Sequence, residues 1–477
     1  MLQRKDMKEV QENCGFCVAS LLHDCNNFLK SSRHRGRDAV GIGAVGDNFI
    51  DVVKWLGTPE SFDISNLHEI LQSKNYHTYL GHIRYTTSGN KNAPLEERLA
   101  EAHPHVIGGT AEYCGSHVII RNCDAIMVCN GQVNAPYLDD VDPTLLKTKC
   151  DTESLLQFFY QYGELELLRR IPGAYSLALA DRRRKEVIVL RDRHGMRPAS
   201  LGKKDGNSCV ASEMIALWEN GGYFIKDISP GSAYYIDSKG SYRSEKVVEP
   251  ELQHCFFEWN YVAHIRSHLS KISVLTVRCR LGEELAAEFR PEDIDLVSFL
   301  PSCPEMAAIS YADSTSLPFM PIFYKKRKER AFLGSSIEER AASIRENLYL
   351  LDNAIPFIRD KNILIVDDSI VRGNNSPYAI KLLKEKGGVK NVYLASYTPP
   401  IGIIGEDGIA RGCEFGVDMP PTDNFIARGR KVEEISKILG VEVGYLSVEG
   451  MLRVFDSIGM PRGKLCTYCI GGKHPFS

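Results

Sequence analysis

The sequence predicts two successive folds in one chain: an α+β part dominated by antiparallel strands, then an α/β part built on a parallel sheet. A chain of 477 residues is too long for one ordinary core. The first half, to about residue 247, is rich in strand-like runs and turns, whereas the second half alternates strands with helices. The junction at residues 246–253 is polar and contains Pro250, which is typical of a segment between domains.

In the first half, apolar runs of strand length are separated by polar segments that favour turns. The expected strands are residues 118–121, 125–128, 176–180 and 186–190. Residues 181–185 are polar and are expected to turn between the last two strands. One helix is expected to follow Asp151, because apolar residues recur there at helical spacing. These residues are Leu155, Leu156, Phe158 and Phe159.

In the second half, strand-like and helix-like segments alternate along the chain. The expected strands are residues 274–282, 296–300, 363–366 and 392–397, with a helix near residues 377–385. Parallel neighbours need a long crossover between them, and a helix usually supplies it. The alternation therefore predicts a parallel, doubly wound sheet.

Charge and composition exclude several classes of partner. Lys+Arg number 58 and Asp+Glu 61, so the formal net charge of −3 gives no reason to expect a nucleic-acid or membrane partner. No apolar run approaches the roughly 18 residues that span a bilayer. Residues 1–13 lack the apolar core of a secretion signal. The 14 scattered cysteines fit a reducing cytoplasm better than a disulfide scaffold.

The most informative segment is the turn that follows the expected strand 363–366. The apolar run ends in Asp367 and Asp368, as a buried parallel strand ends at the edge where open α/β sheets bind ligands. Gly373 lets the backbone approach a ligand, and Ser376 followed by a proline is typical of a helix start. Free N–H groups there favour a phosphate, and the carboxylates suit sugar hydroxyls or Mg²⁺. A solvated turn before a capped helix is the alternative interpretation.

This turn closely resembles the phosphoribosyl-pyrophosphate (PRPP) fingerprint of type I phosphoribosyltransferases, and in particular that of the glutamine PRPP amidotransferase family. The resemblance implies that Asp367 and Asp368 hold the ribose hydroxyls and lie beside Mg²⁺. It also implies a cradle for the 5′-phosphate, made by Ser369, Arg372, Gly373, Asn374, Asn375 and Ser376. Asn374 and Asn375 replace two threonines of the family pattern.

The first half resembles the same family in eight motifs that occur in the family's order. They are Cys14-Gly15-Phe16, residues 34–42, residues 81–89, Asn130-Gly131, residues 151–153, residues 173–176, residues 191–198 and residues 211–213. The resemblance implies an N-terminal-nucleophile glutaminase with αββα layers over residues 14–247. A type I phosphoribosyltransferase domain over 248–450 and a tail over 451–477 follow. The chain is identified as a divergent member of the iron–sulfur, propeptide-bearing branch.

Glutamine hydrolysis requires a nucleophile and a base that works near neutral pH. A free α-amine has a pKa of about 7.7–8.0, whereas a peptide nitrogen is not a base. Cys14 can therefore act as nucleophile only if residues 1–13 are removed as a propeptide, which exposes its own amine. The alternative is that Cys14 is merely a small buried residue.

The resemblance also implies roles for the residues that surround the nucleophile. Arg84 pairs with the glutamine α-carboxylate. Asn130 and the backbone N–H of Gly131 form the oxyanion hole. Asp151 takes the α-amine, with a helix N-cap as its alternative. Arg35 supports the pocket or else makes a surface ion pair.

Four cysteines in three segments match the cluster ligands of the iron–sulfur branch. They are Cys255, Cys413, Cys466 and Cys469. Four thiolates hold a [4Fe–4S] cluster, and four cysteines equally suit Zn²⁺. Free thiols in a reducing cytosol are the remaining interpretation.

The resemblance implies an amidophosphoribosyltransferase that makes 5-phosphoribosylamine from glutamine and PRPP, the first step of purine biosynthesis. It implies Mg²⁺, a cytoplasmic homo-oligomer and inhibition by purine nucleotides. Some positions depart from the family: Ser302-Cys303 replaces Asp-Ser in the pyrophosphate turn, His103 replaces a usual Gln, and Cys129 replaces a His. These departures leave two alternatives open, an amidotransferase with another phosphosugar acceptor and a PRPP-binding sensor without transferase activity.

Overall fold

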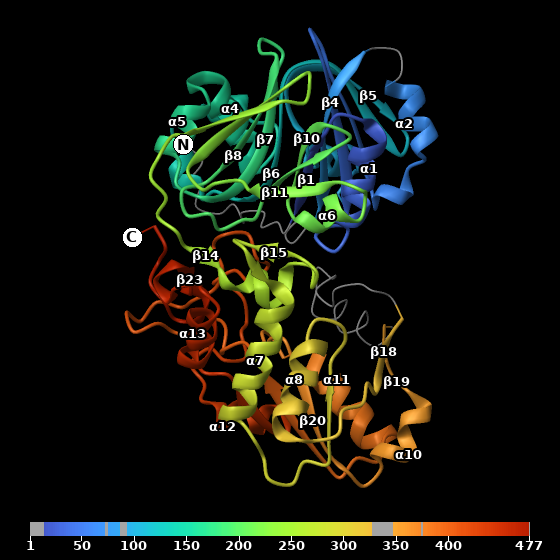
Figure 1. Ribbon diagram of the computed structural model, residues 1–477, viewed down its shortest axis with the longest axis vertical. Helices are drawn as coiled ribbons and strands as arrows, with labels where there is room; N and C mark the ends of the chain where they lie inside the picture. The colour runs from blue at the N-terminus through green and yellow to red at the C-terminus, as the bar shows by residue number, and fades with distance from the viewer. Residues whose placement is uncertain (1–13, 72–74, 86–92, 327–346, 374, 477) are drawn as a thin grey trace.

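The computed structural model describes residues 14–71, 75–85, 93–326, 347–373 and 375–476. The amino-terminal elements form one part of the molecule and the carboxyl-terminal elements the other, with β14 (His254–Cys255) and β23 (Leu465–Cys466) near their junction (Figure 1). No helix within these ranges is long and apolar enough to cross a lipid bilayer.

The amino-terminal part is built on a sheet whose strand order is β11-β9-β10-β1-β4-β2-β3-β6-β7-β8-β12-β13, with β5 paired to β6. Its strands are β1 (Gly15–Ala19), β2 (Ala39–Gly46), β3 (Ile50–Leu56), β4 (Tyr76–Arg84), β5 (His105–Cys114), β6 (His117–Gln132), β7 (Ala174–Asp181), β8 (Glu186–Arg191), β9 (Ser200–Lys204), β10 (Asn207–Ala211), β11 (Tyr223–Asp227), β12 (Ser232–Asp237) and β13 (Tyr242–Lys246). Its helices are α1 (Leu22–Ser31), α2 (Ile64–Leu71), α3 (Leu95–Ala100), α4 (Asp151–Tyr162), α5 (Glu164–Arg170) and α6 (Met214–Trp218).

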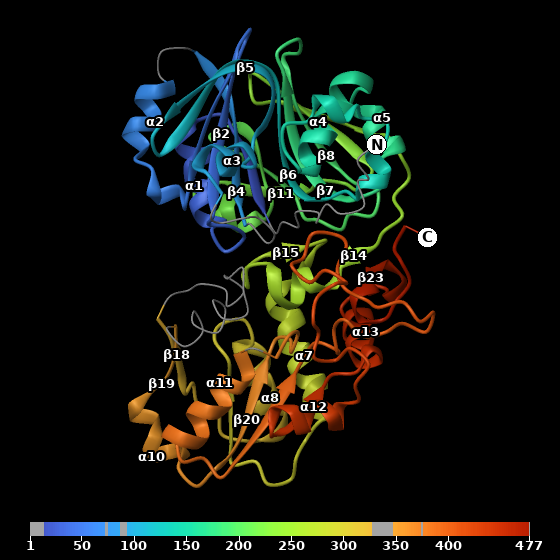
Figure 2. The same ribbon diagram turned by 180° about the vertical axis from the view of Figure 1, so that it is seen from behind.

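The alternation of side chains along the strands creates four layers, αββα. Phe16 and Val18 of β1 belong to the core between the two halves of the sheet, whereas Cys17 packs with α1 and α6 on the outer face. On β7, Ala178 faces the same central core, and Leu179 packs against α4 and α5. Figure 2 shows α1 and α2 on one side of this part and α4 and α5 on the other.

The central strand β6 was expected as two strands, and that expectation is wrong. Residues 118–121 and 125–128 belong to one strand of 16 residues. Asn122 takes a positive φ of 56°, and the pairing of β6 with β5 shifts register between Ile107 and Gly108. The strand therefore bends without ending, and its two halves pair with β3 and β7 respectively.

The carboxyl-terminal part is built on a parallel sheet with the order β17-β20-β21-β22. Its strands are β17 (Leu296–Phe299), β20 (Asn362–Asp367), β21 (Asn391–Ser396) and β22 (Glu442–Tyr445), with β15 (His268–Leu269), β16 (Ile272–Ser273), β18 (Phe323–Lys325) and β19 (Leu348–Leu350) outside it. Its helices are α7 (Val274–Glu288), α8 (Glu305–Thr315), α10 (Ile355–Ile358), α11 (Asn375–Lys381), α12 (Val432–Leu439) and α13 (Val448–Ser457). Leu364 and Ile365 of β20 face two different cores, so both faces of the sheet are covered.

Residues 274–282 were expected as a strand, and the structure shows that they form the first part of helix α7. The Ser273 side chain accepts the N–H of Thr276 and caps the helix. The buried positions recur at three- and four-residue spacing, which is the helical period. These residues are Val274, Val277, Leu281 and Leu285. The β-branched residues suggested a strand, but the period and the cap determine the helix.

The other expected elements are present with small shifts. The expected strands in the parallel sheet correspond to β17, β20 and β21, and the helix after residue 150 is α4. Helix α11 begins at Asn375, so Ser376 lies in its first turn rather than at the cap. Pro377 is tolerated there because first-turn N–H groups lack helical partners. The helix continues into a π-helical turn over Leu382–Lys386.

Candidate active sites

Cys14 lies immediately before β1 and is fully buried. The Nε of Arg35 donates to the Cys14 carbonyl oxygen at 3.0 Å. Arg35 itself is 0% exposed, so the alternative of a surface ion pair is wrong. The N–H of Phe16 donates to the Ser212 hydroxyl at 2.9 Å. Side chains from two other segments therefore hold the backbone at Cys14 and just after it.

Three expected glutamine-site residues lie near one contact between β4 and β6. His82 Nε2 of β4 is 2.9 Å from the Cys129 carbonyl oxygen of β6. Arg84 is two residues beyond His82, and Asn130 is next to Cys129. Gly15 pairs with Ile83, which brings Cys14 to the same end of β4. The fold thus gathers Cys14, Arg84 and Asn130 at neighbouring strand ends.

Asn130 and Gly131 have the features of a prepared binding surface. Asn130 is 0% exposed, yet its Nδ2 and Oδ1 atoms have no hydrogen-bond partner among the described residues. A buried amide without partners costs free energy, so a ligand that pairs with it gains that energy. Gly131 has a φ of 151°, and a Cβ there would lie 1.9 Å from the Ala174 carbonyl oxygen. Only glycine therefore fits at this position.

Arg84 and Asp151 are both anchored by their surroundings. Arg84 Nη2 is 3.3 Å from a Glu101 carboxylate oxygen, in a mostly buried ion pair. Asp151 is the first residue of α4, and Cys150 occupies the N-cap position. The Asp151 carboxylate accepts the Val133 N–H at 2.6 Å, so the N-cap alternative is wrong. The carboxylate instead binds the backbone of Val133, the residue that directly follows β6.

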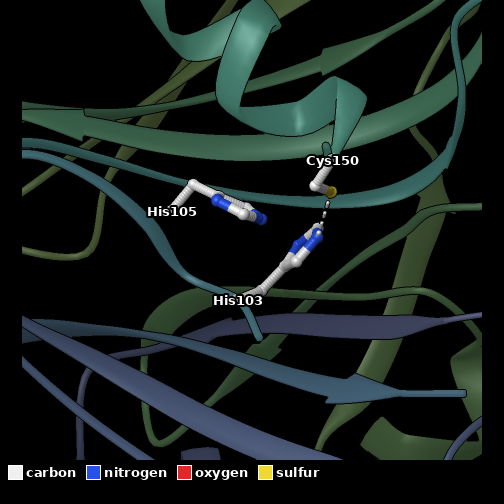
Figure 3. Close-up of side chains that lie close together, drawn as sticks. All are labelled: His103, His105 and Cys150. Atoms are coloured by element: carbon white, nitrogen blue, oxygen red, sulfur yellow. Dashed lines mark hydrogen bonds between the residues drawn. The ribbon is translucent and has the colours of Figure 1, made fainter. Parts of the chain in front are cut away.

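His103, His105 and Cys150 form a buried cluster (Figure 3). Its ligand atoms lie within 4.8 Å of one another. His103 Nδ1 accepts the N–H of Cys129 at 3.2 Å, and its Nε2 is 3.6 Å from Cys150 Sγ. Cys150 Sγ in turn is 3.7 Å from an Asp151 carboxylate oxygen. His103 therefore links the residue before Asn130 to the residue before Asp151.

The hydrogen bonds assign His103 as a donor to Cys150 rather than as a metal ligand. Burial lowers the pKa of His103 and of His105 well below the usual value, so both rings are neutral. Because Nδ1 of His103 accepts a backbone N–H, its proton is on Nε2, where a metal would need a lone pair. Metal-binding histidines instead donate their second N–H to an acceptor.

Asp367 and Asp368, here called the acidic pair, lie at the carboxyl end of β20. This is the edge of the parallel sheet where ligands bind in α/β folds. Burial, and then the charge of Asp368, raise the pKa of Asp367 well above its usual value. The Ser369 hydroxyl donates to Asp368 at 2.8 Å. A bound cation at this edge would relieve the repulsion between the two carboxylates.

The loop after the acidic pair turns closely around its neighbours. Gly373 has a φ of 69°, and a Cβ there would lie 2.7 Å from the Ile426 side chain. Arg372 forms an ion pair with Asp423 and donates to the Asp418 carbonyl oxygen at 2.9 Å. The Nη2 atom of its guanidinium group is thus engaged within the protein. Asn374 lies outside the described residues, whereas Asn375 and Ser376 form the first turn of α11.

The four cysteines from three segments line one cavity of about 20 Å³. Cys255 and Cys466 are neighbours in the parallel pair β14–β23. Cys413 Sγ accepts the N–H groups of Phe415 at 3.4 Å and of Val417 at 3.3 Å. Backbone N–H groups that point at a sulfur stabilise a thiolate, as around metal-bound cysteines.

The chemistry of this cavity fits a bound cationic group. Burial is the main cause that raises the pKa of each of the four thiols. Burial therefore favours neutral thiols, and a cationic group bound between them would stabilise their thiolates. A [4Fe–4S] cluster and Zn²⁺ are both such groups.

Sequence reasoning missed three charged residues that connect these sites. They are Glu213, Glu258 and Arg197, each buried to 1% exposure or less. Glu213 and Arg197 lie inside the family motifs 211–213 and 191–198, and Glu258 lies three residues after Cys255. Their positions in or near these motifs could have indicated a role, but the motifs do not show which side chains the three residues contact.

Comparison with known proteins identifies relatives over the whole length. A glutamine amidotransferase domain model matches residues 120–237. An amidophosphoribosyltransferase of Archaeoglobus fulgidus is 30% identical over 459 residues, covering 94% of this chain and 93% of that protein. One of Mycobacterium bovis is 31% identical over 493 residues, covering 99% of this chain and 88% of that protein.

A solved structure gives the same result for the fold. The glutamine PRPP amidotransferase of Bacillus subtilis, complexed with ADP and GMP, has a TM-score of 0.78 and 26% identity. The match covers 97% of each chain. The expected fold class is thereby confirmed, an N-terminal-nucleophile glutaminase followed by a phosphoribosyltransferase. This chain belongs to the amidophosphoribosyltransferase family.

Proposed function

We propose that this chain hydrolyses glutamine at Cys14 and transfers the ammonia to PRPP, which gives 5-phosphoribosylamine, pyrophosphate and glutamate. The observation that carries the proposal is the pairing of two sites in one chain. One is a buried cysteine beside an unpartnered amide, and the other is an acidic pair at the edge of a parallel sheet. The family's activity, the first step of purine biosynthesis, fits both sites.

In the glutaminase part, the Cys14 thiol attacks the side-chain amide carbon of glutamine. Its own α-amine takes the thiol proton and passes it to the departing ammonia. The developing oxyanion accepts hydrogen bonds from Asn130 Nδ2 and the Gly131 N–H. Arg84 binds the α-carboxylate and Asp151 the α-ammonium group. Water then releases glutamate. The propeptide, residues 1–13, lies outside the described residues.

In the transferase part, ammonia attacks C1 of the ribose and pyrophosphate leaves with the bonding electrons. Asp367 and Asp368 hold the ribose hydroxyls. Residues 369–376 surround the 5′-phosphate, and the Nη2 atom of Arg372 pairs with Asp423 beside this loop. When bound beside the acidic pair, Mg²⁺ would neutralise negative charge on the pyrophosphate.

Cys255, Cys413, Cys466 and Cys469 hold a [4Fe–4S] cluster in this proposal. Four thiolates are the usual ligands of such a cluster, and Zn²⁺ is the alternative. The cluster would connect the tail, residues 451–477, to the first residues of the phosphoribosyltransferase domain, which spans 248–450. Analysis of anaerobically purified protein for iron, sulfide and zinc separates the two groups.

The proposed enzyme also has an expected cellular compartment, class of inhibitor, domain boundary and oligomeric state. None of the 14 cysteines, all within the described residues, forms a disulfide, which fits a reducing cytoplasm. Purine nucleotides are the proposed inhibitors, because the Bacillus subtilis relative was solved with ADP and GMP. Glutaminase residues 14–247 end just after β13, which supports a domain boundary there. A homo-oligomer is expected from the family resemblance.

The acceptor is tested by assaying glutamine-dependent pyrophosphate release. With PRPP and Mg²⁺ the protein is expected to release pyrophosphate and glutamate in equal amounts. Ribose 5-phosphate and fructose 6-phosphate should neither consume ammonia nor raise glutamate production. Stimulation by one of those phosphosugars would instead favour another acceptor. PRPP binding with no turnover would favour the sensor.

His103 is expected to hold the glutamine pocket together. Its replacement by leucine removes the acceptor of the Cys129 N–H and the donor to Cys150. Losing a buried hydrogen bond costs about 1–3 kcal/mol, so we expect the glutamine KM to rise about tenfold or more. His103→Gln restores an acceptor and a donor and should keep KM within about threefold. Steady-state glutaminase kinetics measure both, and equal KM values for the two variants would contradict this role.

A further inference from the structure

Four buried charged side chains form a continuous network between the two parts of the molecule. Arg35 Nη2 lies 3.1 Å from both carboxylate oxygens of Glu258. Arg197 Nη1 lies 2.8 Å from the same carboxylate. Arg35 also pairs with Glu213, which accepts the Ser267 hydroxyl at 2.6 Å. The four residues are each at most 1% exposed.

The two ends of this network reach the nucleophile and the four-cysteine cavity. At one end, Arg35 donates to the carbonyl oxygen of Cys14 at 3.0 Å. At the other end, Arg197 Nη2 donates to the carbonyl oxygen of Phe415. The N–H of Phe415 then donates to Cys413 Sγ at 3.4 Å. These hydrogen bonds and ion pairs form a continuous series of polar contacts from Cys413 in the cavity to Cys14.

We propose that Arg197 and Glu258 are positioning residues for glutamine hydrolysis, and that through them a metal group in the four-cysteine cavity holds Cys14 in its reactive position. The proposal rests on the proposed function, because it requires Cys14 as nucleophile and a metal group on the cysteines. The new element is that a metal group in the four-cysteine cavity would change the rate of glutamine hydrolysis at Cys14. The effect is mechanical, since no electron or proton passes along the network.

Burial makes this network rigid enough for such a role. A buried charge cannot exchange its partner for water, so each ion pair has one favourable arrangement. Losing the group that orders residues 413–417 would free the Phe415 carbonyl to move, and Arg197 with it. Glu258 and then Arg35 would follow. Displacing a catalytic group by about 1 Å can cost up to about a hundredfold in rate.

Arg197→Lys interrupts the network at its least disruptive point. The lysine keeps the positive charge beside Glu258, but its single nitrogen replaces the guanidinium fork that contacts both Glu258 and Phe415. Arg35 keeps both carboxylates, so no buried charge is left without a partner. Arg191→Lys is the matched control. Arg191 is also a buried arginine, but it donates to the carbonyl oxygens of Ile228 and Gly195.

The readout is the rate at which 6-diazo-5-oxo-L-norleucine, a reactive glutamine analogue, alkylates Cys14, followed by peptide mass spectrometry. Wild type, Arg197→Lys and Arg191→Lys are compared with the metal group present and after its removal by a chelator. Metal content and thermal unfolding are measured for each sample. Ammonia-dependent transfer to PRPP reports the second site independently.

We expect Arg197→Lys to alkylate about tenfold more slowly than wild type while ammonia-dependent transfer is unchanged. Metal removal should slow wild type and Arg191→Lys by a similar factor, but should slow Arg197→Lys by less than about twofold, because coupled changes are not additive. If metal removal unfolds the chain, the comparison of the metal-loaded variants decides.

The inference is overturned if neither Arg197→Lys nor removal of the metal group slows the alkylation of Cys14. Equal slowing in Arg197→Lys and Arg191→Lys also overturns it, because a general loss of packing then explains both. Failure of wild type to be alkylated at Cys14 would be a different result. It would remove the proposed nucleophile, and with it the proposed function.

Discussion

Cys14→Ala is expected to abolish glutamine-dependent transfer while ammonia-dependent transfer to PRPP continues at the wild-type rate. In the proposed mechanism the thiol supplies the bond-forming atom. Removing a catalytic nucleophile commonly costs more than about 10³-fold in kcat. The ammonia reaction uses only the site at Asp367 and Asp368, which the substitution leaves intact.

Cys17→Ala is the control for this experiment. Cys17 lies three residues further along, is equally buried, and packs on the outer face of β1 against α1. It should keep both activities. Initial rates with glutamine and with ammonium chloride above neutral pH, where more free ammonia is present, measure the two reactions. Residual glutamine-dependent turnover in Cys14→Ala would refute the nucleophile.

Asp368→Asn is expected to impair transfer from both nitrogen sources. Asp368 is the partly exposed member of the pair and accepts the Ser369 hydroxyl. Hydrogen bonds to a charged group contribute about 1.5–3 kcal/mol, so loss of this carboxylate should lower kcat/KM for PRPP about tenfold to a hundredfold. Asp367→Asn is expected to impair the same reaction, because both carboxylates hold the ribose hydroxyls in the proposed site.

Pyrophosphate release with varied PRPP and Mg²⁺ measures these effects. Asp313→Asn, an exposed substitution on α8, serves as the control and should behave as wild type. Basal glutamine hydrolysis without PRPP should be unchanged in all three variants. A defect confined to the glutamine reaction would place Asp368 outside the ribose site.

Local sequence patterns predicted most of the fold that carries the two sites. The abrupt change from apolar residues to Asp367 correctly indicated a strand end at the edge of a parallel sheet. The helix after residue 150 followed from its apolar spacing. Residues 274–282 are a helix and not the expected strand, because their buried positions follow the helical period and Ser273 caps them. The bend in β6 depends on a positive φ at Asn122, which strand propensity does not encode.

The parts of the site that could not be predicted depend on contacts between distant segments. Arg35 meets Glu258 across 223 residues, and His103 meets Cys150 across 47. No spacing rule places such partners together. Whether an arginine forms a surface ion pair or a buried one is decided by the tertiary fold, and a single sequence does not reveal it.

The most direct test of the account is a peptide mass map of active enzyme after reaction with 6-diazo-5-oxo-L-norleucine. The account predicts a mature chain that begins at Cys14, with one label on that residue and loss of glutamine-dependent activity in proportion to labelling. An active enzyme that retains residues 1–13, or that carries the label elsewhere, would contradict it.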